Sequence, residues 1–114
     1  MKIEFDKIET VVYDGFRHGE GEWQMKLFDD GMNKFLMGVL KPGASLGLHT
    51  HRGNSEVFSV ISGCGKVLCD GEYEEVKPGN VHYCPMGQRH SLIYTGDEDL
   101  VGFGAVPQHP VEEA

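Results

Sequence analysis

The amino-acid sequence predicts an all-β protein, a sandwich or barrel of short strands with little or no helix. Short runs that favour strands recur along the chain and are separated by turn residues. Sixteen of the 114 residues are glycine, and many of these lie between the runs. No segment combines a helical period with capping residues. Many short strands at close spacing are typical of a sandwich or a barrel.

The expected strands follow one another at short intervals. In chain order they are residues 11–13, 23–27, 35–40, 49–51, 56–62, 66–69, 72–76, 81–85, 90–94 and 100–106. The first is β-rich, the second alternates between apolar and polar side chains, and the third is apolar enough for a mostly buried strand. The pair Asp70-Gly71 predicts a type I′ hairpin. Pro-Gly pairs at 42–43 and 78–79 predict turns, and residues 95–99 predict a loop.

Length and composition narrow the class of protein. We expect residues 1–114 to form one domain, with a core at 35–106, a peripheral or edge segment at 1–20 and a tail at 107–114. The net charge of −8 argues against nucleic acid or an anionic membrane as a partner. No run of apolar residues is long enough for a transmembrane helix, and residues 1–6 show neither the apolar core nor the small-residue cleavage site expected of a signal sequence.

Three cysteines indicate the cellular compartment. Cys64, Cys69 and Cys84 are odd in number and have no C-x-x-C spacing. Such residues are typical of reduced thiols and not of a disulfide framework. We therefore expect a cytoplasmic protein, with Cys64 in a turn as a candidate exposed thiol.

Four side chains form a candidate metal site. His49 and His51 lie two residues apart, so on a strand they project from the same face. Glu56 follows a short loop and shares its face with apolar residues further along the strand, which favours an inward position. His90 arrives from a distant segment. Three imidazoles and one carboxylate can hold a divalent transition metal and leave coordination positions open.

The chain resembles the cupin family in two motifs. The first motif is G-x5-H-x-H-x(3,4)-E-x6-G, and its matches are Gly43, His49, His51, Glu56 and Gly63. The second motif is G-x5-P-x-G-x2-H-x3-N, and its matches are Gly79, Pro85, Gly87 and His90. Tyr94 stands where the family usually has Asn. The resemblance implies an antiparallel jelly-roll barrel, the double-stranded β-helix, with His49, His51, Glu56 and His90 binding a divalent metal such as Mn, Fe, Zn or Ni.

Other residues are candidates for the pocket around the metal. Tyr94 and His82 are the candidate general bases, although periodicity leaves the orientation of His82 open. Phe58, Tyr94, Phe103 and Arg89 are candidate substrate contacts, and Trp23, Phe35 and Met37 are further candidate walls. Arg89 and Arg52 each neighbour a ligand histidine, so their default position is the opposite, solvated face. An inward loop would let either guanidinium grip a carboxylate or phosphate.

Two classes of function fit these features. The first is a metal-dependent enzyme acting on a small oxygen-rich metabolite such as a sugar, sugar acid or oxo acid. An isomerase, oxygenase, decarboxylase or lyase would fit. The alternative is a non-catalytic module that binds or senses a small carbohydrate-like molecule. Similarity to the cupin family also implies a homodimer, which would cover an unpaired edge strand near the N-terminus.

Overall fold

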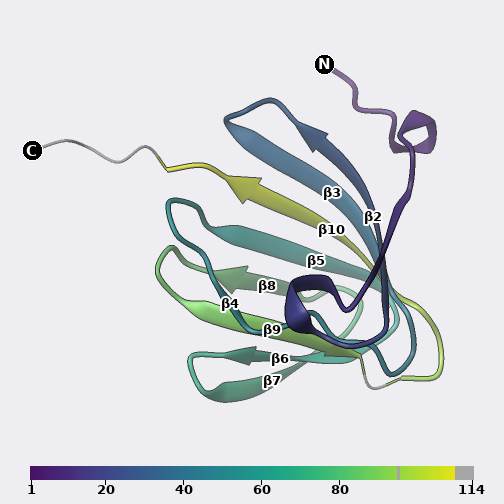
Figure 1. The fold of residues 1–114 in the computed structure, drawn as a ribbon, viewed down its shortest axis with the longest axis vertical. Coiled ribbons are helices and arrows are strands. Elements are labelled where there is room, and N and C mark those ends of the chain that lie inside the picture. The colour runs from purple at the N-terminus through teal and green to yellow at the C-terminus, as the bar shows by residue number, and fades with distance from the viewer. Residues whose placement is uncertain (95, 110–114) are drawn as a thin grey trace, which may run out of the picture.

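The computed structural model describes residues 1–94 and 96–109, except for the side chain of Tyr94, and these residues form an almost entirely β structure (Figure 1). The strands are β1 (Val11–Asp14), β2 (Glu22–Asp29), β3 (Asn33–Leu40), β4 (His49–Thr50), β5 (Glu56–Ser62), β6 (Gly65–Cys69), β7 (Glu72–Val76), β8 (Val81–Cys84), β9 (Arg89–Tyr94) and β10 (Leu100–Pro107). Two single-turn 3-10 helices, η1 (Phe5–Lys7) and η2 (Phe16–His18), precede β1 and β2. The all-β prediction is therefore confirmed, and each expected strand is present.

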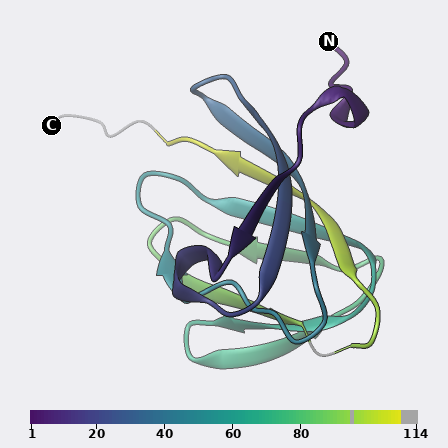
Figure 2. The same cartoon turned by 45° about the vertical axis from the view of Figure 1, so that its right-hand side comes forward.

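The strands form two antiparallel sheets. One has the order β1-β2-β3-β10-β5-β8 and the other the order β4-β9-β6-β7. Strands far apart in sequence are neighbours in both sheets, because β10 lies between β3 and β5, and β9 lies between β4 and β6. Figure 2 shows the six-stranded sheet curving over the four-stranded one.

One apolar core lies between the two sheets. The six-stranded sheet contributes Trp23, Met25, Leu36, Leu40, Phe58, Val60 and Leu100, and the four-stranded sheet contributes Val67, Val76 and Leu92. Burial alternates without interruption along β10, from Leu100 to Pro107. Because successive side chains point to opposite faces, every second residue of this strand enters the core.

Turn chemistry fixes the register of the hairpins. Asp70 and Gly71 have φ angles of 55° and 82°, both positive as a type I′ turn requires, and they join β6 to β7. Gly63 has a φ of 82°, and a Cβ atom there would lie 2.5 Å from the carbonyl oxygen of Asp99. Glycine is therefore required at this turn for both its backbone angle and its lack of a side chain.

Both ends of the described chain are attached to the sheets. At the N-terminal end, β1 pairs with β2 at the edge of the six-stranded sheet. At the other end, the expected tail begins with ordered contacts, because Gln108 donates to the carbonyl of Met32 and His109 to that of Gly53. Residues 110–114 of that tail lie outside the described residues. No helix in the described ranges has the length and apolar character needed to cross a bilayer.

Candidate metal centre

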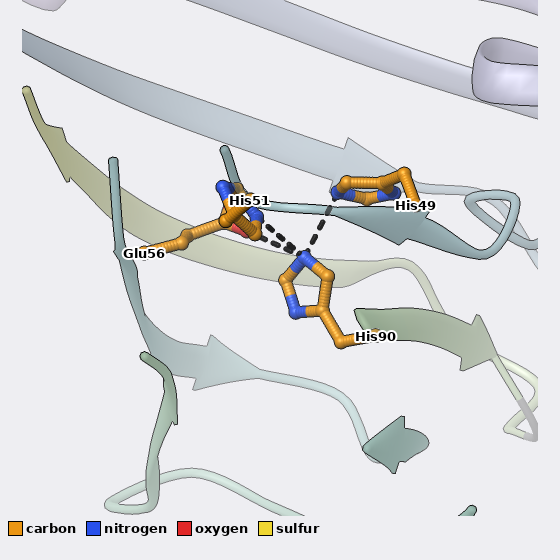
Figure 3. Close-up of side chains that lie close together, drawn as sticks. All are labelled: His49, His51, Glu56 and His90. Atoms are coloured by element: carbon orange, nitrogen blue, oxygen red, sulfur yellow. Dashed lines mark hydrogen bonds and ion pairs between the residues drawn. The ribbon is translucent and has the colours of Figure 1, made fainter. Parts of the chain in front are cut away.

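Four side chains from three strand ends point toward one another (Figure 3). His49 begins β4 and His51 follows that strand directly, whereas Glu56 begins β5. His90 lies in β9, where it is paired directly with His49 across the ladder. The antiparallel pairing of β4 with β9 thus brings together two histidines that are far apart in sequence.

The four side chains are close enough to share one ion. The Nε2 atom of His90 lies 2.8 Å from Nε2 of His51 and 2.9 Å from Nε2 of His49. The Oε2 atom of Glu56 lies 2.9 Å from Nε2 of His90 and 3.1 Å from Nε2 of His51. One ligand atom from each residue lies within 4.8 Å of all the others.

These distances fit a transition metal. Ligand atoms that lie about 2.1 Å from a common ion, at right angles to one another, are themselves about 3.0 Å apart. Neutral imidazole nitrogens and a carboxylate oxygen are acceptors, so they repel one another at such distances unless a proton or a cation lies between them. Three imidazoles and one carboxylate form a donor set suited to a divalent transition metal.

Outer hydrogen bonds orient all three imidazoles. Nδ1 of His49 donates to the carbonyl oxygen of Gly47 at 2.7 Å, and Nδ1 of His51 donates to Oδ1 of Asn54 at 2.6 Å. Nδ1 of His90 lies 3.0 Å from Nε2 of His82. A partner on Nδ1 fixes the tautomer and leaves the Nε2 lone pair free for an ion, as is usual for metal-binding histidines.

Burial and hydrogen bonding shift the pKa values of the cluster residues in different directions. Burial lowers the pKa of His49 to about 4, so this imidazole is neutral near neutral pH. Burial alone would raise the pKa of Glu56, but hydrogen bonds from His51 and His90 outweigh it and hold that pKa below its usual range. For His51, burial lowers the pKa, and hydrogen bonds to Glu56 and Asn54 reverse this and raise it. Glu56 is therefore an anion at neutral pH.

An apolar cavity opens beside the cluster. Its walls include His49, Glu56 and His90 together with the apolar side chains Trp23, Leu36, Leu46, Phe58 and Leu92. His82 also lines the cavity and is buried, and burial lowers its pKa. Cys84 is fully buried and is not part of the wall. Within the described part of the chain, His82 is therefore the one titratable wall residue outside the cluster.

The structure places two of the expected pocket residues elsewhere. Phe103 lies on the outer face of β10, where its ring stacks 6.2 Å from that of Phe35, and it does not line the cavity. Arg89 is exposed on the opposite face of β9 from His90, beside Asp70. Alternation along the strands explains both positions, because neighbours of an inward residue point outward.

Other expectations have different outcomes. Phe58 and Trp23 do line the cavity, whereas Met37 lies on the outward-facing side of β3, next to the inward Leu36. The side chain of Tyr94 lies outside the described residues, so its expected role stays a prediction. Arg52 is exposed.

Sequence reasoning missed several residues near the cluster, among them Asn54 and Arg17. Asn54 holds His51, and Arg17 lines the wider cleft outside the cavity with His49 and His51. The position of Asn54, three residues after a candidate ligand, is a signal that could have been used. Arg17 has no such local signal, because η2 reaches the cluster only through the fold.

Comparisons with known proteins agree with the fold. The family model described as "Cupin domain" matches residues 36–103. The "Oxalate-binding protein" of Thermotoga maritima is 31% identical over 106 residues, which cover 88% of this chain and 88% of that relative.

Solved structures give the same result. The crystal structure of a predicted oxalate decarboxylase from Thermotoga maritima superposes with a TM-score of 0.89 and 27% identity, and the match covers 95% of this chain and 99% of that one. A sugar phosphate isomerase of the cupin superfamily from Silicibacter pomeroyi matches with a TM-score of 0.77 and 21% identity, over 96% of this chain and 77% of that one. The second likeness concerns the fold alone.

Proposed function

Because the chain belongs to the cupin family, we propose that it binds a divalent transition metal through His49, His51, Glu56 and His90 and, with that ion, a small dicarboxylate of the oxalate class. The observation that carries the proposal is the convergence of four donor atoms within 4.8 Å of one another. The ion would retain a net charge of about +1 after Glu56 is counted, so it would attract an anion to its open positions.

The choice of ligand class draws on the relatives and on the cavity. One relative is named an oxalate-binding protein, and a similar structure is described as a predicted oxalate decarboxylase. The cavity is small. Its apolar walls would exclude water from a short anion bound to the ion, which strengthens charge interactions there.

Metal analysis followed by ligand titration tests this function. Protein purified without a histidine tag is analysed for Mn, Fe, Ni and Zn, as isolated and after reconstitution, and each loaded form is then titrated with oxalate by calorimetry. We expect one metal equivalent per chain and saturable binding of oxalate that disappears on chelation. Protein that stays empty after reconstitution with all four ions would refute the metal site, and loaded protein without oxalate binding would refute the ligand class.

Catalysis is the second candidate function. Metal-bound oxalate could undergo decarboxylation, in which cleavage of its C–C bond yields carbon dioxide and, after one proton is added, formate. Such a reaction needs a proton donor. In the described part of the wall, His82 is the one candidate, and its Nε2 atom is already engaged with Nδ1 of His90. This observation favours a protein that binds oxalate without converting it. Formation of formate from oxalate by the metal-loaded protein would instead show that it is an enzyme.

His82 is expected to support the metal through His90. We predict that H82F, which keeps the volume but removes the hydrogen-bond acceptor, weakens metal affinity by roughly 10- to 100-fold. H82Q retains an amide oxygen that can accept from Nδ1 of His90, so its loss is expected to be smaller. Competition titration with a chromophoric chelator measures both values. Equal, wild-type affinities in the two variants would contradict this role.

The proposed assembly is a homodimer in the cytoplasm. The outer face of the six-stranded sheet carries exposed apolar side chains, among them Ile61, Val81 and Tyr83, with exposed fractions of 52%, 60% and 58%. A second copy could cover this face, since exposed apolar patches often mark interfaces. Sedimentation velocity at working concentration tests the assembly, and a purely monomeric profile would refute it.

A further inference from the structure

A second, wider cleft lies outside the metal cluster and carries two cations. It is lined by His49, His51 and Glu56 of the cluster together with Arg17 and Lys34. Within the part of the chain that the structure describes, Glu56 is the one carboxylate in its wall, and neither cation forms an ion pair. The protein as a whole has a net charge of −8, whereas this cleft carries two unpaired positive charges. The charge of the cleft is therefore opposite in sign to that of the whole protein.

Arg17 is held beside the cluster by close backbone contact. It lies in η2 with a φ of 53°, an unusual angle for a residue with a side chain. The amide of Gly47 donates to the carbonyl of Phe16, and a Cβ on Gly47 would lie 1.8 Å from the carbonyl oxygen of Arg17. Directly after η2, a Cβ on Gly19 would lie 2.0 Å from the carbonyl oxygen of Ser45. Two glycines thus let η2 dock on the segment that leads into His49.

Arg17 and Lys34 line the cleft from different elements. The guanidinium of Arg17 lies 5.6 Å from the centre of the Phe16 ring, which restricts its motion. Lys34 lies near the start of β3 and shares the inward face of that strand with Leu36, so its chain enters the cleft from the sheet.

We propose that Arg17 and Lys34 bind the outward oxygens of an anion held at the cluster and thereby select dianions over monoanions. The planar guanidinium is suited to a carboxylate, and hydrogen bonds between charged groups are stronger than neutral ones. The single carboxylate of a monoanion would bind the metal ion. Arg17 and Lys34 would then have no negative charge to bind. This inference deepens the proposed function and rests on it, because it assumes a metal-held anion.

Calorimetry on Zn²⁺-loaded protein tests the inference, since zinc is redox-inert and heat then reports binding. Oxalate, malonate and acetate are titrated into wild type, R17Q, K34Q and the double variant. Matched controls are R52Q and R89Q, which remove the same charge from exposed arginines next to His51 and His90. We expect R17Q to weaken oxalate binding by roughly 10- to 100-fold, K34Q less, acetate to change little, and each control to change oxalate binding less than about twofold.

The possible failures are distinguishable. Oxalate affinity in R17Q and K34Q within twofold of wild type, or an equal loss in R52Q and R89Q, would overturn the selectivity proposal and leave the metal and ligand proposals intact. Wild-type protein that binds zinc but none of the three anions would overturn both the selectivity proposal and the proposed ligand class. Zinc affinity is measured in every variant, and we expect it to stay within twofold of wild type because neither cation belongs to the cluster.

Discussion

Replacing His90 with alanine is expected to abolish stoichiometric metal binding. The Nε2 atom of His90 lies within 2.9 Å of ligand atoms on His49, His51 and Glu56, so it is the one side chain in close contact with the other three. Loss of an outer hydrogen-bond partner of a metal ligand costs roughly 10- to 100-fold in affinity, and loss of the ligand itself should cost more. Metal analysis after dialysis, together with competition titration, measures the effect.

A matched histidine controls for nonspecific metal binding. His109 is exposed and lies outside the cluster, so H109A should keep one metal equivalent with wild-type affinity. Circular dichroism of both metal-free variants checks that the fold is retained. Folded H90A protein that still holds one equivalent at wild-type affinity would show that the ion binds elsewhere.

The convergence of the four cluster side chains was predictable because local rules determine most of its geometry. The two-residue spacing of His49 and His51 and the short loop before Glu56 act within one connected segment. The position of His90 could not be predicted from local spacing alone, because it depends on the pairing of β9 with β4. That pairing follows from the fold that the motifs indicate. Strand alternation then determines which side chains face inward.

It was harder to predict from the sequence whether an aromatic side chain points into the cavity or outward from its sheet. Phe58 faces the cavity and Phe103 does not, although each lies in a strand that alternates. The glycines on either side of Phe103 explain the difference. A Cβ on Gly102 would lie 2.2 Å from Cζ of Phe58, and one on Gly104 would lie 3.0 Å from Cγ of Leu36. Because large side chains from neighbouring strands fill the space, β10 presents its glycines inward and Phe103 outward.

The role of Arg17 depends on contacts that no local pattern encodes. Its docking requires Gly19 and Gly47 to come together, and these residues lie in different segments of the chain. Lys34 could have been identified from the sequence as a residue of the cleft. It lies two residues before the inward Leu36 on the same strand, so the two side chains share a face. A charged residue at an inward position near a strand end is a signal for a site, since buried charges need partners.

Removing the metal is expected to lower the melting temperature of the protein by 10 °C or more, on the order of what linkage predicts. An ion that binds only the folded state at a free concentration 1,000 times its Kd stabilises that state by about 4.1 kcal/mol. For a chain of this length, each kcal/mol shifts the midpoint by roughly 3 to 7 °C. The cluster joins β4, β5 and β9, so the ion would link the two sheets at their open end.

Thermal unfolding of metal-loaded protein with and without EDTA measures the shift, and H90A treated in the same way should show none. A wild-type midpoint that stays within about 1 °C on chelation, in protein shown to carry one equivalent, would mean that the ion does not bind preferentially to the folded state, and a site assembled from three strands could not behave in that way.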